Sequence, residues 1–176
     1  MAPTYKLIAS NTLSSSAASV TFSSIPATYT DLILRISARL DSAQAADSMR
    51  IIINDDTNDN YSITYLQGNG SAASSARESG TGSGGRRILA PYIPAATSTA
   101  NTFGSHELYF PNYTSTSARP VGQFGVQETN ATAALLAVSA NLYRGTSAIS
   151  KFQIFDVGGS NFVSGSSFFL YGVKSS

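Results

Sequence analysis

The chain has 176 residues, a formal net charge of +1 and only 12% charged side chains. It is long enough to bury a core without disulfides or metals and is most simply a single domain over residues 1–176; cysteine is absent, which excludes disulfide and thiolate chemistry. The weak charge gives little attraction for polyanions, and no run of residues has the length of a membrane helix, so we expect neither nucleic-acid nor membrane binding.

Alternation of apolar and polar residues with a period of two dominates the chain. In residues 31–39 (DLILRISAR), the even-numbered residues from Leu32 to Ala38 are apolar and would share a buried sheet face, whereas Arg35 and Arg39 would lie on the other face. A helix would scatter the same apolar groups around its axis. Similar runs, most of them rich in β-branched and aromatic residues, predict strands at 4–10, 19–22, 49–54, 61–67, 106–110, 122–127, 151–155 and 168–173.

Turn signals such as Ile25-Pro26 and Gly158-Gly159 separate these runs. Many short strands punctuated in this way predict an all-β sandwich or barrel, and of the two we expect an antiparallel β-sandwich with long loops. The first and last strands, at 4–10 and 168–173, would pair side by side and close the sandwich.

Two segments are ambiguous. Residues 131–143 are alanine-rich and fit a helix or a strand, but Val138 and Tyr143 suit a strand and the neighbouring runs are strands, so we predict a strand. Residues 42–47 (SAQAAD) are compatible with a short turn of helix.

Residues 80–87 (GTGSGGRR) match the glycine spacing of a dinucleotide-binding loop. Such a loop needs a strand before it and a helix directly after it, because the helix N-terminus holds the phosphate. The preceding residues show no strand pattern, and two prolines within 86–96 prevent a helix. We therefore expect no nucleotide or other cofactor, and interpret residues 68–87 as one long, flexible loop rich in glycine and serine.

Arg77, Arg86 and Arg87 bracket this glycine-rich segment and are opposed only by Glu78. Two interpretations stay open. The arginines belong to a solvated loop tip, or they lie on an arm that becomes ordered against an acidic partner surface, where guanidinium groups bind carboxylates with two hydrogen bonds. The three arginines are our candidate partner-contact residues.

The candidates for catalysis are weak. His106 is the only histidine and would need a nucleophile such as Ser105, but adjacent residues of a strand point to opposite faces. We therefore predict no enzymatic activity and no small-molecule substrate. A carboxylate pair for glycoside hydrolysis would have to come from residues that all lie near turns, namely Asp47, Asp55, Asp56 and Asp59.

An acidic cluster resembles the front of a calcium-binding loop, with oxygens at Asp56, Asn58 and Asn60. Tyr61 stands where such a loop has glycine, and Gln67 stands where it has glutamate. Turns rich in Asp and Asn have this composition without a metal. We expect no metal site.

Three stretches resemble a group of bacteriophage virion structural proteins. They are Tyr5–Ile8 (Tyr-x-Leu-Ile), Phe22–Leu32 (Phe-x-x-Ile-Pro-x-x-Tyr-x-Asp-Leu) and Leu170–Val173 (Leu-Tyr-Gly-Val). Residues 72–102 carry no motif of the group. The resemblance implies a jelly-roll-like sandwich, a homotrimer, and a place on the virion surface after assembly in the host cytoplasm.

Proteins of this group occur as head decoration (cement) proteins and as parts of tail fibres. Low charge and the lack of a catalytic set suit a part built for assembly, so our first hypothesis is a decoration protein that binds the major capsid protein and stabilises the shell. The second is a tail-fibre or receptor-binding domain that recognises host glycans, on which Tyr109, Tyr113 or Tyr143 would stack if exposed; a place in the core is the alternative for each.

Overall fold

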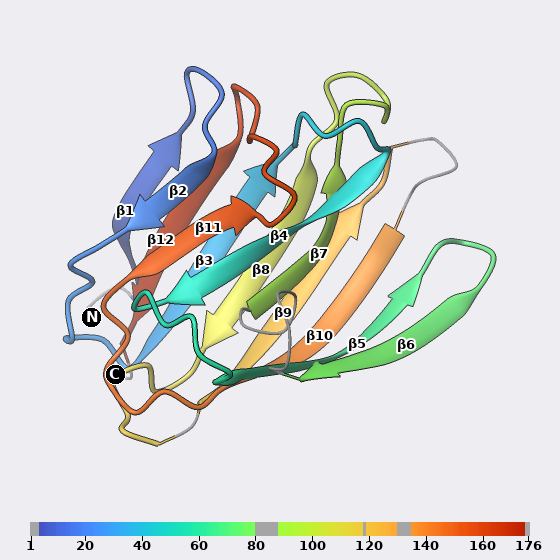
Figure 1. Cartoon of the computed structure of the whole chain (residues 1–176). Helices are drawn as coiled ribbons and strands as arrows, with labels where there is room; N and C mark the ends of the chain where they lie inside the picture. Colours follow the sequence, from blue (N-terminus) through green and yellow to red (C-terminus); the bar gives the residue numbers. More distant parts are fainter. Residues whose placement is uncertain (1–3, 80–87, 118, 130–134, 175–176) are drawn as a thin grey trace.

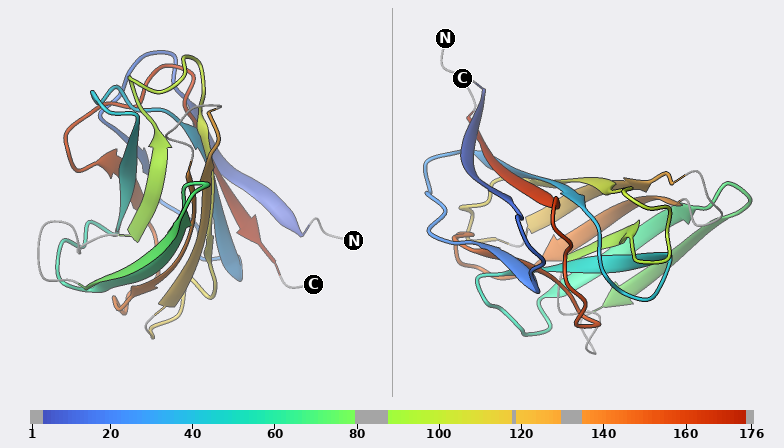
Figure 2. Two further views of the ribbon diagram at one scale, coloured as in Figure 1. Left: turned by 90° about the vertical axis from the view of Figure 1, so that its right-hand side faces the viewer. Right: turned by 90° about the horizontal axis from the view of Figure 1, so that it is seen from above.

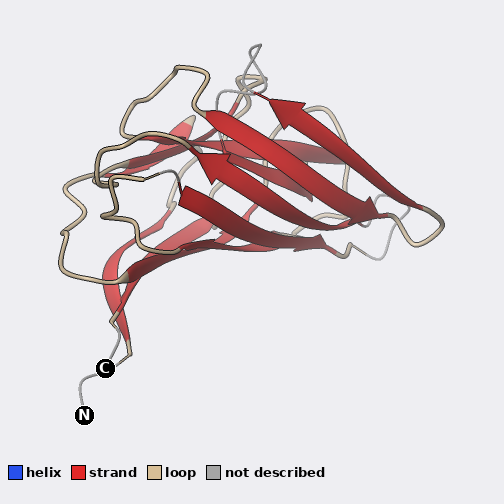
Figure 3. Cartoon of the chain, turned by 90° about the horizontal axis from the view of Figure 1, so that it is seen from below, coloured by secondary structure: helices blue, strands red, loops and turns tan. Residues whose placement is uncertain are grey.

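The computed structural model is a sandwich of two antiparallel sheets (Figures 1 and 3) and describes residues 4–79, 88–117, 119–129 and 135–174. The predicted all-β sandwich is confirmed, and its jelly-roll-like character stays a prediction. The larger sheet has eight strands, in spatial order β1 (Tyr5–Thr12), β12 (Ser167–Val173), β3 (Asp31–Ala38), β8 (Gly104–Phe110), β9 (Arg119–Gln127), β10 (Leu135–Tyr143), β5 (Tyr61–Gly68) and β6 (Ala73–Ser79). The smaller sheet has four, in the order β2 (Ser19–Phe22), β11 (Phe152–Asp156), β4 (Ala46–Ile53) and β7 (Ile88–Pro94).

The core lies between the two sheets and follows the period of two. In β3 the even-numbered residues from Leu32 to Ala38 are all buried, while Arg35 is exposed, as the sequence predicts. Phe110 of β8 and Phe152 of β11 connect the two layers, with ring centroids 4.7 Å apart. Each fully buried side chain of this size stabilises the fold by roughly 1.5–3 kcal/mol.

The two ends of the chain meet at one edge of the larger sheet (Figures 1 and 2). β1 and β12 pair antiparallel, with Tyr5 opposite Val173, which confirms the predicted pairing of the terminal strands. The ring of Tyr29 occupies the space above Gly172, and the Lys174 ammonium lies 5.8 Å from its centroid. The three stretches that carry the phage resemblance therefore lie together in the fold.

Residues 68–87 are not one loop. β6 occupies residues 73–79 and pairs with β5 in a hairpin whose turn contains Gly70, with φ of +84°. The side-chain oxygen of Asn69 accepts hydrogen bonds from the backbone N–H groups of Ser71 and Ala72. The sequence ASSARES has no large apolar residue. This edge strand is therefore stabilised by its backbone pairing with β5 and not by side chains packed in the core.

The glycine motif at 80–87 lies outside the described residues, but both of its flanks are described. β6 precedes it, contrary to the prediction, and β7 follows it, so a strand stands where a nucleotide-binding loop needs a helix. β7 contains Pro91 and Pro94 and lies at the edge of the smaller sheet, the place where strands tolerate proline.

The two ambiguous segments resolve as strand and bend. Residues 135–143 form β10, which confirms the predicted strand there, and residues 131–134 lie outside the described part. The short turn of helix that residues 42–47 allowed does not form, because residues 42–45 form bends and β4 begins at Ala46.

Arg39, expected on the solvent face, is only 8% exposed. Its guanidinium group donates hydrogen bonds to the loop that joins β7 to β8, including one of 2.8 Å to the Thr99 carbonyl and one of 3.1 Å to the Ser98 carbonyl. Backbone oxygens take the place of a carboxylate as partners of this buried cation. The end of β3 and the loop are thereby held together.

We predict that Gly172→Ala destabilises the protein while Gly122→Ala does not. A Cβ atom at Gly172 would overlap the ring of Tyr29, whereas one at Gly122, also in the larger sheet, would meet no atom within 4 Å. Forcing the ring aside should lower the free energy of unfolding by roughly 1–3 kcal/mol. Chemical denaturation of both variants measures this, and equal effects would contradict the close packing described here.

Candidate functional site

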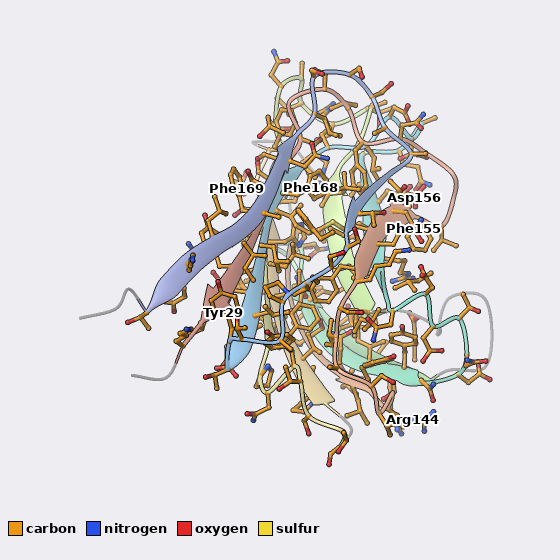
Figure 4. The ribbon with its side chains drawn as sticks, turned by 90° about the vertical axis from the view of Figure 1, so that its left-hand side faces the viewer. Tyr29, Arg144, Phe155, Asp156, Phe168 and Phe169 are labelled. Atoms are coloured by element: carbon orange, nitrogen blue, oxygen red, sulfur yellow. The ribbon has the colours of Figure 1, made fainter. Side chains whose placement is uncertain are left out.

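The candidate site is the outer face of the eight-stranded sheet, the face turned away from the smaller sheet. Figure 4 shows the division at β12, where Phe168 points between the sheets and Phe169 lies on the outer face. Eight large apolar side chains are exposed among the described residues, and all except Val157 belong to this face. They are 41–54% exposed: Tyr5, Leu7, Leu66, Tyr109, Phe124, Leu136 and Val138.

Cross-strand register arranges the outer face into rows that run across all eight strands from β6 to β1. The central row is Ser75, Leu66, Val138, Phe124, Glu107, Arg35, Phe169 and Ser10. The second row is Arg77, Thr64, Ala140, Gly122, Tyr109, Ile33, Tyr171 and Leu7. The third row is Ala73, Gly68, Leu136, Val126, Ser105, Ser37, Ser167 and Thr12.

An aliphatic patch covers β5 and β10 on this face and consists of Leu66, Leu136 and Val138. A hollow of about 200 Å³ lies among these three side chains, and one of about 400 Å³ lies between Leu66, Val138 and Ala140. Exposed apolar side chains that gather in one patch, with hollows between them, are typical of a protein interaction surface.

A charged pair lies at the centre of the outer face. Arg35 Nε is 2.8 Å from Glu107 Oε2, and the two side chains are 54% and 45% exposed. The hydrogen bond from the guanidinium to Glu107 raises the pKa of Arg35. A groove of about 480 Å³ adjoins the pair and extends between Phe124 and Phe169.

The three tyrosines proposed as glycan platforms lie in different environments. Tyr109 is exposed, and its hydroxyl donates a hydrogen bond of 2.7 Å to Asp31, which raises the tyrosine pKa to about 12. Tyr113 and Tyr143 are buried in the core, which is the alternative that the sequence left open for each of them. Buried rings have no face to offer a ligand.

His106 lies between the sheets and is only 2% exposed. It contacts a chain of polar side chains: its Nδ1 is 3.3 Å from Gln123 Nε2, and Gln123 accepts a hydrogen bond from Ser139, which accepts one from Asn141. Burial lowers the pKa of His106 to about 4. Ser105 lies on the outer face, as predicted, so the two residues do not meet.

The acidic cluster is engaged within its own turn. Asp56 accepts hydrogen bonds from the Asn58 backbone (2.9 Å), the Asn60 side chain (2.7 Å) and the Tyr143 hydroxyl (3.2 Å). Burial raises the pKa of Asp56, but these hydrogen bonds outweigh it and the net shift is downward. Within the ranges that the structure describes, no group of three or more His, Asp or Glu side chains is placed to hold a metal ion.

The predicted arginine cluster is described only in part. Arg77 lies on β6, is exposed and begins the second row of the outer face, whereas Arg86 and Arg87 lie outside the described residues. The sequence reasoning missed the patch around Leu66 and Val138. The signal was present in residues 136–142, where the apolar Leu136 and Val138 alternate with the polar Ser139 and Asn141, which lie between the sheets.

No family model, curated protein sequence or solved structure matches the chain. Among the described residues, no helix is long and apolar enough to cross a membrane.

We predict that acid destabilises the protein through His106. Its pKa is about 4 in the folded chain against the ordinary 6.5, so between these pH values the unfolded chain binds a proton that the folded chain does not. The free energy of unfolding should be unaffected by this group above pH 6.5 and should fall by about 3 kcal/mol as the pH drops to 4.

Denaturant unfolding of the wild type and of His106→Gln at a series of pH values checks this. The difference between the two proteins removes the contribution of the carboxylates, and a difference that stays constant between pH 7 and 4 contradicts the prediction.

Proposed function

We propose that the chain is a non-enzymatic virion structural protein, a head decoration protein that attaches to the capsid shell through the outer face of its eight-stranded sheet. The observation that carries the proposal is the concentration of exposed apolar side chains on that face. The reason for placing the protein in a phage virion is a resemblance to phage structural proteins in three stretches, Tyr5–Ile8, Phe22–Leu32 and Leu170–Val173.

The outer face suits a protein partner. Its exposed side chains are mainly aliphatic and aromatic, and they are fixed on a regular sheet, so little conformational entropy is lost on docking. Removing such side chains from water stabilises a complex by about 25 cal/mol per Å² of apolar surface before the costs of association. A sheet face therefore replaces the 68–87 segment as our proposed contact surface.

The positions of the tyrosines favour a head decoration protein over a tail-fibre domain that binds glycans. Of the three proposed sugar platforms only Tyr109 is exposed, and its hydroxyl is already bonded to Asp31. The apolar patch on β5 and β10 has aliphatic side chains, which offer a sugar no aromatic ring to stack on.

Counting copies per virion by quantitative mass spectrometry tests the placement. A decoration protein covers a shell built from many copies of one subunit, so we expect hundreds of copies in each purified virion. A handful of copies would place the chain in the tail, and none would refute the virion assignment.

We predict that Leu66→Lys weakens attachment to the shell while the fold is kept. Leu66 is 52% exposed on the outer face, so a charge there costs little in the free chain but is desolvated in a complex. Co-sedimentation with virions that lack the protein should show binding at least roughly tenfold weaker. Thr21→Lys, at an exposed position of β2 in the other sheet, is the matched control and should bind as wild type. Equal binding by both variants would refute the proposed surface.

A further inference from the structure

We infer that the outer face also binds a second copy of the chain, face to face. The two copies are related by a two-fold axis that lies between them, runs parallel to the strands and passes over the boundary between β3 and β8. The inference rests on the proposed function only in taking the outer face as a surface for assembly. It goes further in specifying a two-fold pair and its register, in place of the homotrimer that the phage resemblance implies. The rows of side chains are complementary to themselves after a rotation of 180° about this axis.

The charged pair of Arg35 and Glu107 is complementary to itself across the axis. Arg35 and Glu107 are adjacent on β3 and β8, on the two sides of the axis. The rotation places Arg35 above the partner's Glu107 and Glu107 above the partner's Arg35. Four charges then alternate in sign, and each has two opposite neighbours, which compensates for the water that the charges lose on pairing.

The central row is self-complementary beyond the charges. Phe124 follows Glu107 on one side of the axis, and Phe169 follows Arg35 on the other. Phe124 therefore faces the partner's Phe169, and by symmetry Phe169 faces the partner's Phe124. In a two-fold interface every contact occurs twice in this way, so one favourable pairing of rings gives two.

The second row matches large residues with small ones. Gly122 would face the partner's Tyr171, and Ala140 would face the partner's Leu7, because these residues are equally distant from the axis. Nothing lies within 4 Å of the position that a Cβ of Gly122 would occupy, so no atom of the same chain blocks the approach of a side chain directly above Gly122. Interdigitation of this kind lets two sheets pack at their usual separation of about 10 Å.

The axis divides the sheet unequally, with three strands (β1, β12 and β3) on one side and five (β8, β9, β10, β5 and β6) on the other. The rotation therefore leaves β5 and β6 of each copy beyond the partner's β1. Leu66 on β5 stays uncovered by the second copy and open to the shell. The partner's β1 covers β10 with Leu136 and Val138, so of the aliphatic patch only Leu66 stays open for shell attachment.

Analytical ultracentrifugation at micromolar concentrations tests the pair. Wild type should sediment as a dimer, and Arg35→Glu and Glu107→Arg should each weaken dimerisation at least roughly tenfold, because like charges then face each other across the axis. Both side chains are about half exposed, so each variant should keep its fold, which circular dichroism checks.

Mixing the two variants shows whether the charge reversals act across the dimer or within each chain. Each variant alone carries charges of one sign at both positions, but the mixture places two glutamates opposite two arginines and should restore the dimer. A wild-type monomer, a trimer, a dimer insensitive to both charge reversals, or a mixture that stays monomeric would each overturn the inference. Shell attachment is read separately from virion copy number and from Leu66→Lys, so either proposal can fail without the other.

Discussion

The packing of the eight-stranded sheet against the four-stranded sheet is the interaction on which the rest of the molecule depends. Leu34 of β3 and Leu108 of β8 are opposite each other in register and are both fully buried between the sheets. Because side chains alternate along a strand, placing these two inward turns Arg35 and Glu107 outward together. The charged pair and the rows beside it are therefore consequences of the core, and moving a strand by one residue would exchange the two faces.

The alternation allowed most of the strands to be predicted, but it failed where packing does not select apolar residues. β6 was missed because ASSARES contains no apolar residue large enough to mark a face, and β7 because two prolines obscured it. Arg39 was misplaced because a buried cation bonded to backbone oxygens has no local signal in the sequence. The rows of the outer face could not be predicted for another reason. Leu66 and Phe124 become neighbours of Val138 only because β5 and β9 pair with β10, and the sequence does not show which strands pair.

β9 and β10 show why the candidate surface was hidden. On these strands the side chains between the sheets include Gln123, Ser139 and Asn141, and the apolar Phe124 and Val138 point outward. The hydrogen bonds of Gln123, Ser139 and Asn141 explain how polar groups are accommodated inside, since buried polar groups are costly unless they are bonded. Because both faces of β10 carry apolar residues and the inner one also carries Ser139 and Asn141, the assumption that apolar residues face the core does not assign the two faces of this strand.

The pairing of β1 with β12 has a consequence for synthesis on the ribosome. Residue 5 leaves the ribosome long before its partner, residue 173. β1 has no neighbour in the larger sheet other than β12, whereas β5 and β6 form a local hairpin that can close as soon as both have emerged. The nascent chain must therefore carry β1 unpaired until β12 has been made, and β12 then inserts between β1 and β3.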